Sequence, residues 1–554
     1  MSRIFFPQYK KGKKGLALKK GLSILDYLKK AGIEINAECG GKGTCGKCII
    51  RIEKGKENLN GKTKAEKKFP LSSDEKLACQ TRIEKVKSDI VIFIRDIGKY
   101  QILKESIARN QNKFGSGLIL NPLTVAKNGR VIHNRKVLDN YKGKIYGLAV
   151  DVGTTTLVFQ IVDLQTGEIV NTTAGISPQI IYGGDVISRI GYISINKNRV
   201  IYLVPKEREK KLKELQRCVI NGINQSLKKF KTLTPYIYEA VIVGNSTMRN
   251  IFFGLDVFSL GFKPYETIYK EPITKSAKEL GLKIFPKAKV YGAALIGGHA
   301  GADTLANILA SEIYKSKKPS MLIDIGTNGE IVLGNSKRLI SATLPAGGAF
   351  EGADVSCGVG AVEGAIKNIK IKNGKAVYET IGGKKPVGYH VGYPTVVGIC
   401  GSGLIDLLAE LLKSGIMDKS AKLKKDFKVT DKIKLTQADV YQLVNAKAGL
   451  KVDQSILLKH YGISVKDLDK IYLSGGFGNY INVKNAIRIG LLPDAEKKIV
   501  KIGNGALEGA REMLVSKDSR KTAEKIAKKT EHIKTNELEK NFTYLIAENM
   551  YFED

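Results

Sequence analysis

The stretch IYGLAVDVGTTTLVFQIVDLQTGEIV, residues 145–170, decides the fold of most of this chain. It reads as an apolar strand, a turn of the form D-x-G-T-T-T, a second strand and a Thr-Gly hairpin turn. The same order of features returns in SMLIDIGTNGEIVLGNSKRLI, residues 320–340, around the turn D-x-G-T-N-G. Two copies of one uncommon turn predict two related half-domains that face each other.

The chemistry of these two turns is that of a phosphate-binding loop. Glycine lets backbone N–H groups approach a ligand closely, and the hydroxyl and amide side chains that follow add further donors. The two aspartates that open the turns can hold Mg²⁺ through water molecules. We therefore predict Asp151 and Asp324 to be catalytic. The predicted phosphate-binding residues of the two turns are Gly153, Thr154, Thr155, Thr156, Gly326, Thr327, Asn328 and Gly329.

The repeated turn resembles that of the superfamily of acetate and sugar kinases, Hsp70 and actin (ASKHA), in which the nucleotide sits between two duplicated α/β subdomains. IYLSGGFGNYI (471–481) is similar to its adenosine-contacting strand and Gly-Gly turn. GNGALEGA (503–510) is similar to its small-residue helix, and VGICGSGLID (397–406) adds a Gly-rich turn. The resemblance implies that ATP and Mg²⁺ bind here, and it adds Gly401, Gly475 and Gly476 to the binding residues.

A second unusual segment, CGGKGTCGKC at residues 39–48, holds three of the seven cysteines, and Cys79 follows in LACQT. The segments RIFFPQY, LALKKG, CIIRIEKG and DIVIFI around it read as strands. SILDYLKKAG reads as a helix that Ser23 caps and Gly32 ends. These features predict a small mixed sheet with one crossing helix.

Four kinds of site compete for this cysteine loop. A dinucleotide turn or a phosphate loop must lead into a helix, whereas a strand follows here. Zinc sites usually pair two short C-x₂₋₄-C knuckles, but the spacing here is C-x₅-C-x₂-C with one distant cysteine. A [2Fe–2S] cluster held by Cys39, Cys45, Cys48 and Cys79 fits best, because this spacing is close to the plant-type pattern. Zinc-binding or structural cysteines remain the alternative.

The cysteine segments resemble the β-grasp ferredoxin family, in which GTCGKC and LACQT carry the cluster. We thus expect a multidomain protein of mixed α/β and α+β class, in which an N-terminal β-grasp ferredoxin domain precedes a duplicated ASKHA ATPase core. The expected boundaries are 1–98 for the ferredoxin domain, 99–144 for a linker region, and 145–318 and 319–554 for the two ATPase subdomains.

Composition limits the partners. The formal net charge is +37, yet the lysines are spread along the chain and no nucleic-acid-binding motif appears, so nucleic acid is disfavoured as a partner. Residues 1–100 carry an excess of Lys and Arg that could steer an acidic protein to this end. Neither a long apolar run nor a leader pattern is visible, which predicts a cytoplasmic protein without a membrane partner.

Five further segments resemble the reductive activators of corrinoid proteins, namely GGDVISRI (183–190), VGNSTM (243–248), GGHAGADTLANI (297–308), AGGAFEGADVSCGVGAVEGAI (346–366) and GICGSGLID (398–406). This resemblance implies an enzyme that uses ATP to drive an electron from its iron–sulfur domain onto a Co(II) corrinoid protein, which regenerates Co(I) for methyl transfer. A corrinoid protein and an upstream low-potential electron donor are the implied partners, and a homodimer is left open.

Two other functions stay open at this point. One is ATP-dependent electron donation to another low-potential metalloenzyme, such as a radical dehydratase, and the other is a small-molecule kinase. For the corrinoid function, residues 346–360 are a candidate docking segment. The hydroxyls of Ser341, Thr343 and Ser356 are candidate oxygen ligands to cobalt, with ordinary turn hydrogen bonding as the alternative for each.

Overall fold

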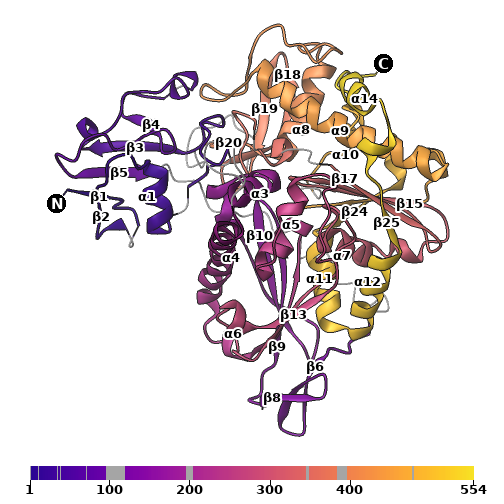
Figure 1. The fold of residues 1–554 in the computed structure, drawn as a ribbon. Helices are drawn as coiled ribbons and strands as arrows, with labels where there is room; N and C mark the ends of the chain where they lie inside the picture. The colour runs from indigo at the N-terminus through magenta and orange to yellow at the C-terminus, as the bar shows by residue number, and fades with distance from the viewer. Residues whose placement is uncertain are drawn as a thin grey trace. The chain divides into compact units, whose positions relative to one another are not determined.

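The computed structural model describes all residues except 1, 10, 11, 34, 38, 70, 95–118, 195–203, 345–347, 353, 383–395, 477–479 and 554. The chain divides into two compact units (Figure 1). The first comprises Met1–Gly98 together with Pro178–Val204, and the second comprises Lys99–Ser177 together with Pro205–Asp554.

The first unit contains a five-stranded mixed sheet in the order β2-β1-β5-β3-β4. Its strands are β1 (Arg3–Phe5), β2 (Leu16–Ala17), β3 (Ile49–Lys54), β4 (Glu75–Leu77) and β5 (Ile90–Ile94). Strand β1 runs parallel to β5, and the other neighbours are antiparallel. The predicted small mixed sheet is confirmed.

The helix that accompanies this sheet, α1 (Ile24–Ala31), has the ends expected from the sequence. The Ser23 hydroxyl accepts a hydrogen bond from the Asp26 N–H, the Asp26 side chain accepts from the Ser23 N–H, and Gly32 ends the helix at φ 61°. The same unit holds the 3₁₀ turn η5 (Pro178–Tyr182) and α3 (Val186–Ser194). Lys29 of α1 lies 4.9 Å from the ring centre of Tyr182.

The second unit is built on two six-stranded sheets that share a five-strand arrangement and differ in the place of the sixth strand. The first has the order β11-β10-β9-β12-β14-β13, with β9 (Tyr146–Val152), β10 (Thr156–Asp163), β11 (Ile169–Ile176), β12 (Ile237–Val243), β13 (Ile273–Ser276) and β14 (Lys289–Gly292). The second has the order β24-β23-β15-β16-β17-β25, with β15 (Ser320–Ile325), β16 (Gly329–Gly334), β17 (Leu339–Leu344), β23 (Ile471–Ser474), β24 (Ile499–Gly503) and β25 (Thr530–His532). The sixth strand is β13 in the first sheet and β25 in the second.

In both sheets a three-strand antiparallel meander is joined through its first strand to a parallel neighbour. Strand β9 pairs with β12, and β15 pairs with β23, both in parallel. Each D-x-G-T turn joins the first two strands of its meander. The predicted duplication is therefore confirmed at the level of strand order.

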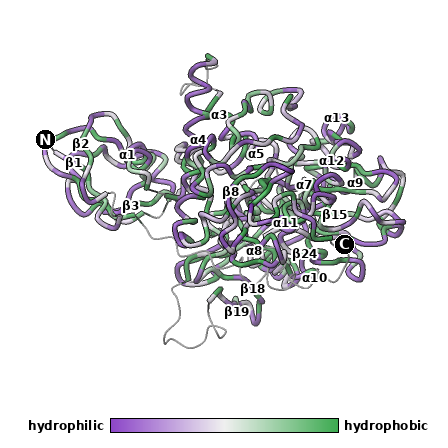
Figure 2. Tube along the Cα trace, turned by 90° about the horizontal axis from the view of Figure 1, so that it is seen from below, coloured by the Kyte–Doolittle hydropathy of each residue, from purple (hydrophilic) through white to green (hydrophobic). Residues whose placement is uncertain are grey.

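Helices cover these sheets. They are α4 (Pro205–Leu227), α5 (Ser246–Phe253), α6 (Ala277–Leu280), α7 (Ala302–Ser311), α8 (Gly401–Lys413), α9 (Gln437–Tyr461), α10 (Val483–Arg488), α11 (Gly505–Val515), α12 (Lys517–Lys529), α13 (Thr535–Leu538) and α14 (Phe542–Glu548). Both hydrophilic and hydrophobic residues lie along α4 (Figure 2). Its buried side chains Val219, Ile223 and Leu227 recur at helical spacing and belong to the apolar core beside the first sheet.

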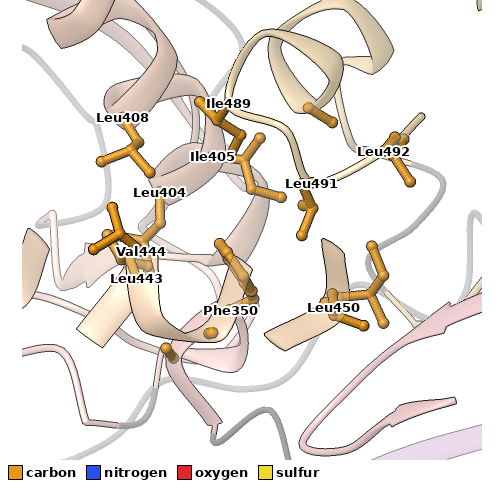
Figure 3. Packing of buried hydrophobic residues seen from close by; sticks show 14 of the residues in the cluster. Phe350, Leu404, Ile405, Leu408, Leu443, Val444, Leu450, Ile489, Leu491 and Leu492 are labelled. Atoms are coloured by element: carbon orange, nitrogen blue, oxygen red, sulfur yellow. The ribbon is translucent and has the colours of Figure 1, made fainter. Parts of the chain in front are cut away.

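Two packing features of the second unit are a close contact between two helices and an apolar core around Phe350. Helix α11 packs against α7, and a Cβ atom at Gly509 would lie 2.1 Å from the Ala306 carbonyl oxygen, so only glycine allows this approach. The apolar core beside the second sheet surrounds the buried ring of Phe350 with residues of α8, α9 and the segment after α10, among them Leu404, Leu443 and Leu491 (Figure 3).

Three smaller sheets complete the second unit. They comprise β6 (Thr124–Lys127), β7 (Arg130–His133) and β8 (Lys136–Asn140); β18 (Ala365–Lys372), β19 (Lys375–Thr380) and β20 (Gly398–Ile399); and β21 (Phe427–Lys428) with β22 (Lys434–Leu435). The first of them is anchored to β12, since the Thr124 hydroxyl donates to the buried Glu239 carboxylate at 2.6 Å. Residues 99–118 of the expected linker lie outside the described residues.

Candidate functional site

A pocket in the second unit is lined by both phosphate turns. Its lining includes Asp151, Gly153, Thr154, Thr155, Thr156, Asp324, Gly326, Thr327, Asn328, Gly401, Gly475 and Gly476, which are all but one of the nucleotide-site residues expected from the sequence. The exception, Gly329, begins β16 and is not among the lining residues. The strand ends of β9, β15 and β23 and the start of α8 thus meet around one space.

Glycine is required at two of these positions because of the atoms beside it. A Cβ atom at Gly153 would lie 2.5 Å from the Thr156 carbonyl oxygen. Gly475 has φ 110°, and a Cβ atom there would lie 2.8 Å from the Asp324 carboxylate. The Gly-Gly turn after β23 is therefore folded directly against the second aspartate.

Amide side chains hold the two aspartates in place. Asn504, at the start of α11, donates to Asp151 Oδ2 at 3.1 Å. Asn307 of α7 donates to Asp324 Oδ2 at 2.6 Å, and its own carbonyl oxygen accepts from the Ser474 hydroxyl at 2.7 Å. These bonds fix the side-chain rotamers of both aspartates.

Several lining residues were not singled out from the sequence, namely Asn245, Asp303, Ile325, Glu330, Phe350, Glu351, Gly360, Ala361, Asn504 and Ala506. Asn245, Asp303 and Asn504 belong to segments that carried the family resemblance, but no spacing rule marks them as ligands. Asn245 donates to the Thr154 hydroxyl at 3.0 Å and so supports the first turn from β12.

The pocket is strongly acidic, and its carboxyl groups hold protons more tightly than usual. Burial raises the pKa of Asp151 to about 7, and the neighbouring carboxylates of Asp324 and Glu351 add to this rise. Burial and the charge of Asp151 raise the pKa of Asp303 to about 8, while burial raises that of Asp324 to about 6. The pKa of buried Glu330 is also well above its usual value. A multiply charged phosphate chain would enter this pocket together with a cation or with protons.

The two phosphate turns contact each other through their threonines. The hydroxyl oxygens of Thr155 and Thr327 are 2.8 Å apart. Both hydroxyls donate to one carboxylate oxygen of Glu351, from Thr155 at 2.7 Å. The two half-domains are therefore in hydrogen-bonding contact where the predicted phosphate chain would lie.

The four clustered cysteines of the first unit also come together. Cys39 is within side-chain hydrogen-bonding reach of Cys45 and Cys79, and Cys48 within reach of Cys79. Because the antiparallel ladder pairs Ile49 of β3 with Leu77 of β4, Cys48 and Cys79 lie at one end of the same strand pair. Among the residues that the structure describes, no three His, Cys, Asp or Glu side chains are arranged to hold a metal ion, and the four thiols contact one another in the order Cys45, Cys39, Cys79 and Cys48.

The backbone of this loop fits an iron–sulfur cluster. Gly40, Gly41, Gly43 and Gly46 all have positive φ, which lets the short loop turn its cysteines to one side. The thiols of Cys45 and Cys79 donate to the Cys39 sulfur and lower the pKa of that thiol, and the N–H groups of Cys45 and Thr44 add to this effect. Gln80 donates to the Cys79 sulfur at 3.4 Å. Hydrogen bonds to sulfur of this kind stabilise thiolate ligands and tune a cluster.

The candidate cobalt ligands occupy different environments. Ser341 is fully buried in β17, so its hydroxyl is closed to a bound partner. The hydroxyl of Ser356 donates to Asp439 at 2.8 Å. Thr343 is half-buried near the end of β17. Of the candidate docking segment 346–360, residues 346, 347 and 353 lie outside the described part.

Three matches with known protein families cover most of the chain. Residues 10–84 match the 2Fe-2S iron-sulfur cluster binding domain, residues 146–316 match the middle region of RACo, and residues 318–554 match the C-terminal domain of RACo, described as the ASKHA domain. No helix of the described residues has the length and apolar character needed to cross a membrane.

Individual relatives agree with these matches. The chain is 30% identical to the corrinoid activation enzyme RamQ of Eubacterium limosum, over 92% of this chain and 93% of that protein. It is 27% identical to the [Co(II) methylated amine-specific corrinoid protein] reductase of Methanosarcina barkeri, over 70% of this chain and 73% of that protein. A solved structure, the reductive activator for corrinoid, iron-sulfur protein, aligns with TM-score 0.69 and 28% identity, over 100% of this chain and 98% of that one.

The N-terminal iron–sulfur domain, the ASKHA domain and the length of these alignments agree on one assignment. The chain belongs to the family of reductive activators of corrinoid proteins.

Proposed function

We propose that this protein uses ATP to transfer an electron from a [2Fe–2S] cluster to the Co(II) of a corrinoid protein and so regenerates the Co(I) needed for methyl transfer. Cys39, Cys45, Cys48 and Cys79 would hold the cluster. The observation that carries the proposal is the presence, in one chain, of four cysteines brought together by one loop and Cys79, and of a pocket lined by two phosphate turns. Two relatives are named for corrinoid activation or reduction, which supports this choice of acceptor.

The energetics explain why a nucleotide pocket accompanies the cluster. A plant-type [2Fe–2S] cluster has a reduction potential near about −400 mV, and the Co(II)/Co(I) couple lies lower, so the transfer is uphill. Each ~100 mV costs about 2.3 kcal/mol per electron. ATP binding or hydrolysis can offset this cost if it favours a complex in which the ligands of the cobalt are altered.

Different pocket residues would bind the phosphates and the Mg²⁺ ion of the nucleotide. Gly153 and Gly326 would bring backbone N–H groups to the phosphates, and the threonine hydroxyls beside them would donate to phosphate oxygens. Asp151 and Asp324 would hold Mg²⁺ through water molecules, and this ion would offset the negative charge that the phosphates bring to an acidic pocket. Asn307 and Asn504 keep the two carboxylates oriented for that contact.

The proposal is tested by anaerobic spectroscopy on the full chain. Chemically reduced protein with MgATP should convert a Co(II) corrinoid partner to its Co(I) form, followed through their separate absorption bands. ADP, or no nucleotide, should give much less Co(I). If several corrinoid proteins showed no ATP-dependent change while the cluster reoxidised onto another metalloenzyme, the function as an electron donor to that enzyme would replace this one.

A further inference from the structure

Glu351 lies between the two phosphate turns, although the sequence did not mark it as a site residue. One of its carboxylate oxygens accepts hydrogen bonds from Thr155 of the first turn and Thr327 of the second. The other oxygen faces Gly326, at which a Cβ atom would lie 3.6 Å from it. The carboxylate thus contacts three of the residues expected to bind phosphate.

The donors that hold Glu351 are those that a terminal phosphate would need. An ionised carboxylate offers only acceptor oxygens, as a phosphate does. Each threonine hydroxyl has a single proton to donate, so it cannot serve both acceptors at once. Glu351 and a phosphate that bridges the two turns would therefore compete for the same hydroxyls, and their negative charges would repel each other at this distance.

We propose that Glu351 is an internal latch that stands in for the terminal phosphate of the nucleotide and leaves the two turns when ATP binds. The proposal rests on the nucleotide function proposed above and adds a residue that sets how tightly the pocket binds ATP. It also identifies the segment that would transmit a structural change from the nucleotide pocket to other parts of the second unit.

The position of Glu351 in the fold makes this coupling direct. It is the last residue of the short 3₁₀ turn η10 (Gly348–Glu351), and the preceding Phe350 is buried among α8, α9 and the segment after α10 (Figure 3). Gly352 follows with φ 81°, and a Cβ atom there would lie 2.4 Å from the Val359 carbonyl oxygen. A shift of the Glu351 backbone would therefore be passed to Gly352 and, through this contact, to Val359.

The far side of this segment is tied to α9. The Ser356 N–H and hydroxyl donate to the two carboxylate oxygens of Asp439, which also caps the start of that helix. The segment thus connects the phosphate turns with the N-terminus of α9. Coupling between two sites is reciprocal. A partner protein that moves Ser356 or Val359 would therefore change the affinity for ATP, and ATP would change the affinity for that partner by the same factor.

Nucleotide affinity of the full-length protein tests the latch. A latch that is closed about nine-tenths of the time lowers the apparent affinity about tenfold, so Glu351→Gln should bind ATP up to about tenfold more tightly. The gain should be smaller for ADP, which lacks the phosphate that the carboxylate imitates. Glu379→Gln, a neutralisation of an exposed glutamate in β19, should leave both affinities unchanged.

The outcomes separate the latch from the proposed function. If the unaltered protein bound neither nucleotide, the ATP pocket itself would be refuted. If it bound ATP and Glu351→Gln bound it equally or more weakly, the latch would be refuted, and weaker binding would make Glu351 a ligand. Glu351→Asp keeps the charge but shortens the reach to both threonines, and it should also bind ATP more tightly. An unchanged affinity in that variant counts against the latch.

Hydrogen exchange supplies an independent measurement. In the unaltered protein, ATP should speed exchange in peptides that cover residues 348–352, because it displaces Glu351 from the threonines. In Glu351→Gln the same peptides should exchange faster before ATP is added, and ATP should change them little. Equal exchange with and without ATP in the unaltered protein would contradict the latch.

Discussion

At the scale of single residues, Cys79 shows how a distant side chain completes a short loop. The β3–β4 ladder brings it next to Cys48, and the Ala78 N–H donates to the Cys48 carbonyl at 2.8 Å. The sequence could indicate that Cys79 belongs with the loop because its spacing is that of a ferredoxin. It could not supply the strand pairing that places the sulfur.

We predict that Cys79→Ser loses the visible absorption of the cluster or shifts it, because serine replaces one of four sulfur ligands. Iron and acid-labile sulfide should fall from about two of each per chain, as a [2Fe–2S] cluster requires. Cys218→Ser, in α4 of the other unit, is the matched control and should keep both. If Cys218, Cys357 or Cys400 proved equally necessary, the proposed ligand set would be wrong.

Asp303 carries a prediction on pH and stability. Its pKa is raised to about 8 by burial and by Asp151, and that of Asp151 is raised to about 7. Between about pH 4 and pH 8 the unfolded chain therefore loses protons that the native pocket retains, so the free energy of unfolding falls as the pH rises. We expect Asp303→Asn to reduce this loss by on the order of 3 kcal/mol.

Thermal unfolding at pH 5 and pH 8 without nucleotide measures this effect. The unaltered protein should lose more stability between the two values than Asp303→Asn does. Asp431→Asn, at an exposed position on the loop between β21 and β22, should keep the full pH dependence. An equal dependence in all three proteins would show that Asp303 is ionised in the folded state.

At the scale of elements, the strands and turns were predictable because their signals are local. The two D-x-G-T turns and the strands around them were expected from apolar runs and fixed turn residues. The supporting side chains were not, because Asn245, Asp303 and Glu351 reach the pocket from three separate segments. Asn245 follows β12, Asp303 lies in α7 and Glu351 ends η10, so the tertiary fold is needed to bring them to the turns.

The contact between α7 and α11 carries a prediction on packing. A Cβ atom at Gly509 would lie 2.1 Å from the Ala306 carbonyl oxygen, so Gly509→Ala must push the two helices apart. We expect a loss of about 1–3 kcal/mol in the free energy of unfolding. Nucleotide binding should also weaken, because α7 carries Asp303 and Asn307.

Denaturant unfolding compared with nucleotide titration checks this prediction. Gly191→Ala is the matched control, since Gly191 also lies in a helix, α3, but has no atom within 4 Å of the added Cβ. That change should be neutral or slightly stabilising, because alanine has the higher helix propensity. If Gly509→Ala were as stable as Gly191→Ala, the two helices would not be held at the distance described.

At the scale of the whole molecule, electron storage and nucleotide binding are assigned to different units. The cysteine loop belongs to the first unit, and every residue that lines the acidic pocket belongs to the second. Neither set of residues contributes a side chain to the other. A mutation should therefore be able to remove nucleotide binding without removing the cluster, or the reverse. The proposed reaction nevertheless needs both units in one chain.

We predict that Asp151→Ala and Asp324→Ala each abolish ATP turnover and leave the cluster spectrum unchanged. Each change removes a carboxylate that is proposed to orient Mg²⁺, and it leaves Asn504 or Asn307 without the oxygen to which it donates. Phosphate release and the absorption spectrum would be measured on the same samples. A chemical reductant should still reduce the cluster of both variants. When a Co(II) corrinoid partner is added, they should form Co(I) no faster with MgATP than without it. Full ATP turnover in either variant would remove that aspartate from the catalytic pair, and loss of the cluster spectrum would show that the two units do not function independently.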